Sequence, residues 1–178
     1  MRKCCDLKWG FIHIRILKDV IDVYFVSPTR GKLTLKQVVE DIIAFVEEEP
    51  NAAYKLIIGT DSQARDTVCF VTAIIVHRVG KGARYYYRKK FMSQVKSLRH
   101  KVYTETSFSL EVVNALEKEL SKTRCRNLHV EIHVDIGQNG DTRELIREVV
   151  GWVMSSGYEV KIKPQAFGAT KVADKYTK

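Results

Sequence analysis

Hydrophobic positions along the chain change their spacing several times, and each change marks an expected element. Hydrophobic residues recur every three or four positions between Thr34, which can cap a helix, and the acidic run before Pro50. This spacing predicts a helix. Three runs of strand character follow, at residues 55–60, 68–77 and 83–91. The turns between these runs are polar or contain glycine, so we expect an antiparallel meander.

The second half of the chain alternates between helices and strands. A hydrophobic stripe predicts a long helix over residues 98–120, and an alternating run predicts a strand over 128–134. The segment Asp141–Glu144 resembles a capping box and opens another helix, which ends at Gly157. The order is completed by a last strand at 158–162 and a short terminal helix at 169–177.

This order predicts the α/β fold class, with a five-stranded mixed sheet and helices on both faces. We expect the strands at 128–134 and 158–162 to run parallel to the strand at 55–60, because helices connect them as crossovers. Residues 27–31 are expected to form a turn. A chain of 178 residues has the size of one domain, so we expect one layered structure rather than two.

Charge adds a candidate binding surface. The chain has 30 Lys and Arg residues against 21 Asp and Glu, a net charge of +9, which favours an anionic partner such as nucleic acid. Residues 81–90, the densest basic stretch, interleave cations with three tyrosines. Such a surface can neutralise phosphates and stack bases, although a hairpin with a solvated basic face gives the same pattern. The candidate nucleic-acid-binding residues here are Arg84, Tyr86, Arg88, Lys89 and Lys90.

The sequence favours a cytoplasmic protein with no membrane partner. Charged residues and a histidine interrupt the hydrophobic stretch at 9–17, and no cleavage site of small residues follows it. No other segment approaches the ~18 uninterrupted apolar residues of a membrane span. The four cysteines match neither a disulfide framework nor a zinc-ligand spacing, so we expect reduced thiols.

Two aspartates stand at the ends of expected strands. Asp61 follows the strand at 55–60, and Asp135 follows the strand at 128–134. Ligands of open α/β sheets bind beyond the carboxyl ends of the strands, so these carboxylates meet at one edge if the strands are parallel neighbours. A turn-forming aspartate explains either residue alone, but the pair favours a functional site.

Two further carboxylates are candidates for the same site. Glu105 falls on the helix stripe that faces the sheet, where a glutamate is unfavourable unless it is paired or binds a cation. The alternative is a helix that begins near Thr106, with Glu105 as a solvated first-turn anion. Asp174 lies in the terminal helix between Lys171 and Lys175, and an exposed helix face is the more ordinary explanation of it.

A cluster of carboxylates at one sheet edge suits a particular chemistry. Mg²⁺ and Mn²⁺ prefer oxygen ligands and retain waters for substrate phosphates. Two such ions can activate a water and stabilise the leaving oxygen in a phosphoryl displacement. Without cations, carboxylates gathered in this way repel one another.

Several motifs together resemble the YkuK-like family of predicted nucleases in the ribonuclease H-like superfamily. They are Ile58–Gln63, Glu105–Glu111, His133–Gly140, Gly151, Lys163–Pro164 and Val172–Lys175. The resemblance implies a single ribonuclease H-like domain over about residues 25–178, with residues 1–24 as an N-terminal extension of unknown role. It also implies four residues that are both catalytic and metal ligands: Asp61, Glu105, Asp135 and Asp174.

The resemblance further implies a metal-dependent nuclease. Its substrate would be RNA, an RNA–DNA hybrid or structured DNA, and it would use Mg²⁺ or Mn²⁺, with two ions once substrate is bound. Lys163 and Lys171 become candidate nucleic-acid contacts, although a solvated lysine is the more ordinary interpretation of each. Unlike the best-known ribonucleases H, this chain has Gln165–Gly168 instead of a histidine in the loop before the last acid.

Two other interpretations stay open. A non-catalytic nucleic-acid-binding module on the same fold would use the basic stretch at 81–90 without any turnover. A phosphotransfer enzyme related to actin-like ATPases would share the strand order, but the chain is short for their paired domains and has no convincing Gly-rich phosphate loop. The sequence predicts no particular oligomeric state.

Overall fold

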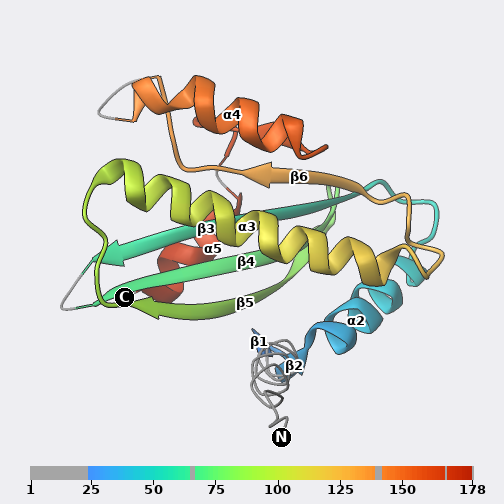
Figure 1. The fold of residues 1–178 in the computed structure, drawn as a ribbon. Coiled ribbons are helices and arrows are strands. Elements are labelled where there is room, and N and C mark those ends of the chain that lie inside the picture. Colours follow the sequence, from blue (N-terminus) through green and yellow to red (C-terminus); the bar gives the residue numbers. More distant parts are fainter. Residues whose placement is uncertain (1–23, 65–66, 139–141, 167, 178) are drawn as a thin grey trace, which may run out of the picture.

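The computed structural model describes residues 24–64, 67–138, 142–166 and 168–177 (Figure 1). Residues 1–23 of the expected N-terminal extension and the aspartate of the expected capping box lie outside these residues. In the described part of the chain, no helix is both long enough and apolar enough to cross a bilayer.

Seven strands form one mixed sheet, in the order β2-β1-β5-β4-β3-β6-β7. They are β1 (Tyr24–Ser27), β2 (Gly31–Thr34), β3 (Tyr54–Ala64), β4 (Val68–Arg78), β5 (Gly82–Met92), β6 (His129–His133) and β7 (Glu159–Lys161). The three long strands β3, β4 and β5 form the expected antiparallel meander. β6 is parallel to β3, and β7 is parallel to β6. The α/β class and these strand directions confirm the prediction.

The predicted number of five strands is wrong, because the chain before the first described helix, α2 (Leu35–Glu47), forms a hairpin. β1 and β2 pair antiparallel, and β1 joins β5 through Val26 and Tyr87. Gly31, with φ of +72°, ends the turn expected at 27–31 and starts β2. Each of these strands has only four residues, too few for the alternation that distinguishes a strand from a loop.

Helices cover both faces of the sheet, as predicted (Figure 1). They are α2 (Leu35–Glu47), α3 (Leu98–Leu120), α4 (Ile146–Ser155) and α5 (Gly168–Thr177), with a single 3-10 turn, η1 (Arg143–Leu145), before α4. In Figure 1, α3 lies in front of the sheet, α4 lies above β6 at the top of the view, and α5 lies behind the sheet. Thr34 caps α2 through a reciprocal pair of hydrogen bonds with Gln37.

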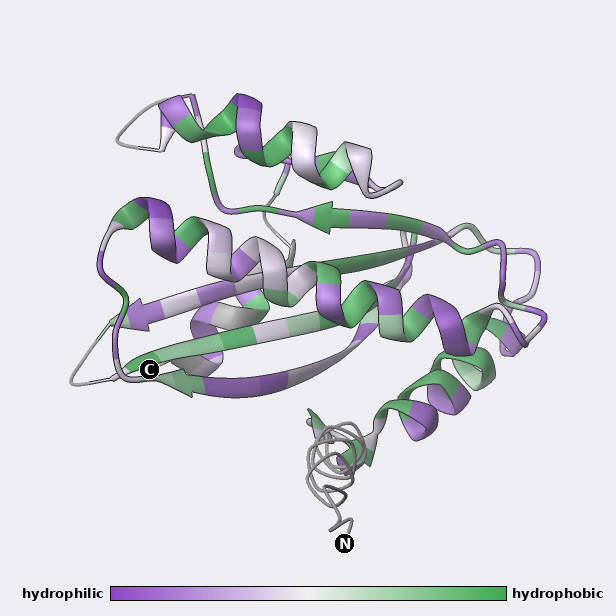
Figure 2. Cartoon of the chain, viewed as in Figure 1, coloured by the Kyte–Doolittle hydropathy of each residue, from purple (hydrophilic) through white to green (hydrophobic). Residues whose placement is uncertain are grey.

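The main hydrophobic core lies between the sheet and the helices α2, α3 and α4. Figure 2 shows hydrophobic stripes on these helices and largely hydrophobic strands β3 and β4. The two strands are buried on both faces because α5 covers them from behind. Fully buried core residues include Ile42, Leu56, Ile58, Ile74, Leu116 and Ile132. Packing in this core fixes the positions of β3 and β6, whose carboxyl-terminal ends bear the candidate site.

Candidate active site

The sheet brings Asp61 and Asp135 to one edge. β3 and β6 are parallel neighbours with Gly59 paired to His133, and each aspartate follows its member of that pair by two residues. The expected parallel direction of these two strands is therefore confirmed, and the condition that they are neighbours is met. β3 continues beyond its expected end to Ala64, so Asp61 lies inside the strand, and its side chain is only 12% exposed.

Glu105 points toward the sheet from α3. The helix begins at Leu98, two turns earlier, so the alternative of a solvated first-turn glutamate is wrong. Glu105 is buried, and Ser62 Oγ donates a hydrogen bond of 2.7 Å to its Oε1. Lys101, one turn before Glu105, places its Nζ 3.6 Å from Glu105 Oε1 and 4.0 Å from Asp61 Oδ1. One ammonium group therefore lies between two of the carboxylates.

Asp174 reaches the same place from α5, on the opposite face of the sheet. Although the residue is exposed, its carboxyl group forms a hydrogen bond with the carboxyl group of Asp61. Asp174 is therefore exposed, as the alternative expects, and it also interacts with Asp61.

Close packing fixes α5 on the sheet at two points. Gly59 leaves room for the helix, because a Cβ at this position would lie only 2.4 Å from the Ala169 Cβ. Toward the end of α5, the ring of Tyr176 stacks on that of Tyr87 with 3.7 Å between centroids. The hydroxyl groups of Tyr176 and Tyr85 form a hydrogen bond of 2.9 Å. Asp174 lies between these two points of contact.

Burial and crowding raise the pKa of two of these carboxyl groups. Burial raises the pKa of Asp61 to about 6, and the hydrogen bond with Asp174 adds to the rise. Burial likewise raises the pKa of Glu105 to about 7, with smaller contributions from the negative charges of Asp61 and Asp135. The positive charge of Lys101 opposes both shifts. The site therefore holds less negative charge at neutral pH than its carboxyl groups could carry.

Lys163, in the segment after β7, faces the carboxylates. Its Nζ lies 2.9 Å from Asp135 Oδ1, yet this buried oxygen has no well-aligned hydrogen bond. The carboxylate of Asp135 raises the pKa of Lys163, and those of Asp61 and Asp174 add to the effect. Electrostatic contacts thus link all four acids, which we call the carboxylate cluster: Asp61, Glu105, Asp135 and Asp174.

The donor set of the carboxylate cluster fits a hard divalent cation. All its donors are carboxylate oxygens, the ligand type that Mg²⁺ and Mn²⁺ prefer. The buried Asp135 Oδ1 has no well-aligned hydrogen bond and already lies beside the Lys163 ammonium group, so its position suits a cation. The ligand atoms of the carboxylate cluster are not all within 4.8 Å of one another in the described structure. Within the described residues, the one group of three with ligand atoms within 4.8 Å of one another is His129, Glu131 and Glu159.

That histidine–glutamate group lies at the other end of β6, and lysines balance its charge. Lys55 Nζ is 2.7 Å from Glu131 Oε1, and Lys161 Nζ is 2.6 Å from Glu159 Oε1. His129 Nε2 lies between the two carboxylates, at 3.3 and 3.0 Å. These ion pairs compensate the buried negative charge of Glu131, so no metal ion is needed to explain it.

Tyr86 is not a stacking residue, and the prediction that it contacts nucleic acid is wrong. The side chain is fully buried, and its hydroxyl group donates a hydrogen bond of 2.7 Å to Asp41 Oδ2. Successive residues of a strand point to opposite faces, so three consecutive tyrosines cannot all face solvent. Tyr86 faces the core, whereas Tyr85 and Tyr87 face α5.

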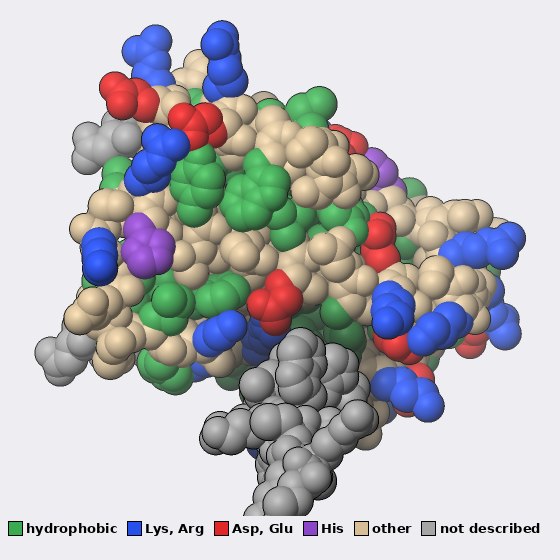
Figure 3. Space-filling model, in the orientation of Figure 1, with side chains coloured by type: hydrophobic (Ala, Val, Ile, Leu, Met, Phe, Trp, Pro, Cys, Tyr) green, Lys and Arg blue, Asp and Glu red, His purple; other side chains and the backbone are tan. Residues whose placement is uncertain are grey.

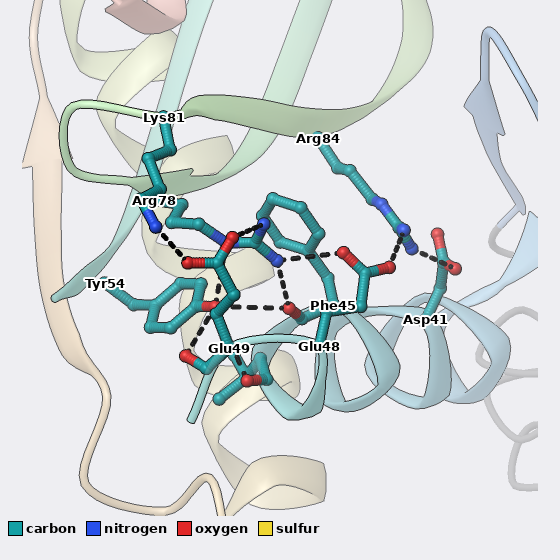
Figure 4. A network of polar contacts seen from close by, with 9 residues as sticks. Asp41, Phe45, Glu48, Glu49, Tyr54, Arg78, Lys81 and Arg84 are labelled. Atoms are coloured by element: carbon teal, nitrogen blue, oxygen red, sulfur yellow. Dashed lines mark hydrogen bonds and ion pairs between the residues drawn. The ribbon is translucent and has the colours of Figure 1, made fainter. Parts of the chain in front are cut away.

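Ion pairs with α2 occupy much of the basic stretch (Figure 4). Arg84 Nη1 is 3.0 Å from Asp41 Oδ1, and the other end of its guanidinium pairs with Glu48. Lys81 pairs with Glu49. These cations neutralise the acidic end of α2, so the prediction that Arg84 is a nucleic-acid contact is not supported by its surroundings.

Further along β5, the basic residues differ in availability. The side chain of Arg88 is only 11% exposed, and its Nη2 pairs with Glu111 Oε1 at 3.0 Å. Lys89 and Lys90 are exposed, as is Lys171 on α5. Lys89, Lys90, Lys163 and Lys171 therefore remain candidate phosphate contacts.

The sequence predicted no role for three residues of the site: Gly59, Ser62 and Lys101. Lys101 precedes Glu105 by four residues, the spacing at which helical side chains pair, so this signal was available. Ser62 and Gly59 acquire their roles only when α3 and α5 pack on β3, and nothing in the sequence indicates which helix faces them.

Comparisons with known proteins agree with this architecture. A family model described as "Ribonuclease H-like" matches residues 37–178. The Bacillus subtilis (strain 168) protein described as "Uncharacterized protein YkuK" is 36% identical over 166 residues, which span 86% of this chain and 96% of that protein. No solved structure gives a significant match. The chain therefore belongs to the ribonuclease H-like family, in the group that includes YkuK.

Proposed function

We propose that this protein is a metal-dependent nuclease that hydrolyses phosphodiester bonds in RNA, an RNA–DNA hybrid or structured DNA. Membership in the ribonuclease H-like family indicates a nuclease or another nucleic-acid-related function. The finer proposal rests on one observation, the convergence of four carboxylates from β3, α3, the end of β6 and α5. The net charge of +9 favours a polyanionic substrate.

In this proposal the carboxylate cluster holds Mg²⁺ or Mn²⁺, with two ions in the presence of substrate. Asp61 is the central ligand of the cluster. Its carboxyl group interacts with that of Asp174, and the ammonium group of Lys101 lies near both Asp61 and Glu105. When bound, two divalent ions supply the activation of a water and the stabilisation of the leaving oxygen in an in-line displacement.

Residues of this chain set the protonation and the orientation of the cluster. Burial and the hydrogen bond with Asp174 raise the pKa of Asp61 and so favour its protonated form, whereas a metal ligand would have to be the carboxylate. Ser62 orients Glu105 through its Oγ. Lys101 and Lys163 balance charge in the free protein and lie where a phosphate oxygen could replace a carboxylate as their partner.

A cleavage screen tests the proposal. Single-stranded RNA, an RNA–DNA hybrid and branched DNA are incubated with Mg²⁺ or Mn²⁺, beside the Asp61→Asn and Asp135→Asn proteins. We expect cleavage by the wild-type protein only, with both variants folded. Glu111→Gln is the matched control, because this carboxylate is exposed on α3 and pairs with Arg88 outside the cluster. Cleavage that survives both Asn substitutions would contradict the proposal.

A nucleic-acid-binding module without catalysis is the second candidate. One observation favours it: Lys101 and Lys163 already neutralise part of the carboxylate cluster, so the free protein tolerates the acids without metal. This candidate requires salt-dependent binding and no turnover with either metal. Multiple turnovers in the same screen would exclude it.

A further inference from the structure

An aromatic cleft opens on the face of the molecule that carries α3 and α4. It has a volume of about 420 Å³, and its aromatic walls are Tyr103 and Phe108 from α3 and Trp152 from α4. Met92 and Lys90, near the end of β5, complete the side toward the sheet. Figure 3 shows this face, with hydrophobic side chains gathered over α3 and α4 and basic side chains beside them. A concave cleft lined mostly by apolar and aromatic side chains with one charged group is a candidate binding site.

The aromatic side chains of the cleft are held in fixed orientations. The rings of Tyr103 and Trp152 stack with 5.7 Å between centroids and 24° between planes. Glu148 accepts hydrogen bonds from the Tyr103 hydroxyl group and from Arg99, and the Arg99 guanidinium lies 5.3 Å from the Tyr103 ring centroid. A flat ligand would therefore meet a preorganised aromatic surface and would not have to order it.

The charge of the cleft favours an anionic ligand. Lys90 is the one charged residue among the lining side chains, and its Nζ lies 4.3 Å from the centroid of the Phe108 ring. No carboxylate lines the cleft within the described residues. Exposed Lys96 lies between β5 and α3 in the sequence. Aromatic faces beside lysines are the combination that binds the bases and phosphates of single-stranded nucleic acid.

The sheet relates the cleft directly to the carboxylate cluster. Ser62, Phe70 and Lys90 are paired in register across β3, β4 and β5, and all three face α3. Ser62 bonds to Glu105, Phe70 packs edge-on against Phe108, and Lys90 lies over the same ring. Neighbouring strands are ~4.8 Å apart, so the cleft begins roughly 10 Å from the cluster.

We propose that this cleft binds an unpaired base of the substrate strand beside the scissile phosphate. Trp152 and Tyr103 form the stacking surface for the base, and Lys90 neutralises the adjoining phosphate. The inference deepens the proposed nuclease function and rests on it, and it names the substrate class as nucleic acid with a single-stranded segment at the site. A fully paired duplex offers no free base to the cleft.

Binding measured without cleavage tests the inference. A fluorescein-labelled 12-nucleotide single-stranded RNA, its DNA counterpart and the matching duplexes are titrated with protein in EDTA and followed by anisotropy. We expect Trp152→Leu to weaken binding of the single strands about tenfold, because stacking on one aromatic residue contributes ~1–3 kcal/mol. Trp152→Phe, which keeps an aromatic face, should restore most of the affinity. Met154→Ala, at an exposed position on the same helix, should bind like the wild type.

The outcomes separate the inference from the proposed function. Single-strand affinity that is unchanged in Trp152→Leu, or wild-type affinity for duplexes equal to that for single strands, would overturn the inference. If Asp61→Asn abolishes cleavage in that case, the nuclease proposal still stands. Conversely, Trp152-dependent binding without turnover in either metal would retain the cleft and reject the nuclease. If Trp152→Leu does not fold, Tyr103→Leu serves as the same test with Tyr103→Phe as its conservative partner.

Discussion

Gly59 on β3 and Ala169 on α5 meet so closely that no side chain fits between the two elements. A Cβ at Gly59 would lie 2.4 Å from the Ala169 Cβ and 2.8 Å from the carbonyl oxygen of His133. Because α5 carries Asp174, this contact sets how far that carboxyl group reaches toward Asp61. A glycine on a buried strand thereby positions Asp174, which lies five residues further along α5 than the contact at Ala169.

Gly59→Ala should therefore separate α5 from the sheet and disrupt the carboxylate cluster. Overpacking of this kind destabilises by about 1–3 kcal/mol, and we expect Mn²⁺-dependent cleavage to fall at least tenfold because Asp174 moves. Urea unfolding and cleavage rates measure the two effects. Gly151→Ala is the control, since Gly151 is exposed on α4 with nothing within 4 Å of its added Cβ, and alanine favours a helix. Wild-type cleavage by Gly59→Ala would contradict this role of Gly59.

The raised pKa values of Asp61 and Glu105 make metal-free stability depend on pH. The folded protein retains these two protons up to about pH 6 and pH 7, whereas the unfolded chain releases them near pH 4. The folded state thus binds more protons between these limits, and the free energy of unfolding falls as pH rises from about 4 to about 7. We expect a loss on the order of 3 kcal/mol from each of the two groups, measured by urea unfolding in EDTA.

Asp61→Asn removes one of these groups and provides the matched test. Because asparagine does not titrate, the variant should lose less stability between pH 5 and pH 8 and should be more stable than the wild type at pH 8 in EDTA. Glu111→Gln, at the exposed carboxylate on α3, should keep the wild-type pH dependence. Identical pH profiles for Asp61→Asn and the wild type would show that Asp61 ionises normally.

Divalent cations should reverse this instability. A ligand that binds only the folded state stabilises it by about 2.7 kcal/mol at a concentration 100 times its Kd, so Mn²⁺ should raise the Tm of the wild-type protein at pH 7.5. Asp135→Asn should abolish the increase. Glu159→Gln, in the histidine–glutamate group at the other end of β6, should leave it unchanged. The opposite pattern would assign the cation to the histidine–glutamate group.

Tyr86 should affect stability and leave nucleic-acid binding unchanged. Tyr86→Phe removes the hydrogen bond to Asp41 Oδ2 and should lower the free energy of unfolding by about 1–2 kcal/mol.

The double substitution Lys89→Ala/Lys90→Ala should instead affect binding and not stability. It should weaken oligonucleotide binding and reduce the salt dependence of that binding, while the free energy of unfolding stays constant. Anisotropy titrations at two salt concentrations and urea unfolding distinguish the two classes. Weaker binding by folded Tyr86→Phe would contradict its assignment to the core.

Hydrophobic periodicity was sufficient for the long elements. The stripe on α3 includes Glu105, but periodicity alone left open a helix that begins near Thr106, and the observed start at Leu98 decides between the two interpretations. The parallel pairing of β3 and β6 followed from the helical crossover between them. Both inferences rest on patterns that repeat many times along the chain.

Short or paired features could not be predicted in the same way. The four-residue strands β1 and β2 exist because each pairs with a neighbour, and a single strand of that length has no signature of its own. The basic stretch was interpreted as one surface, although alternation along β5 sends Tyr86 and Arg88 to the α3 side and Lys89 to the other. Whether Arg84 is available depends on the distant acids Asp41 and Glu48.

The most direct test of the central claim is a crystal structure of the protein soaked in Mn²⁺ and measured at a wavelength where manganese scatters anomalously. We expect anomalous peaks among Asp61, Glu105, Asp135 and Asp174, with at least one ion bound to both Asp61 and a second member of the cluster. Crystals that show manganese only elsewhere, or leave these four carboxylates bound to Lys101 and Lys163 alone, would contradict the account.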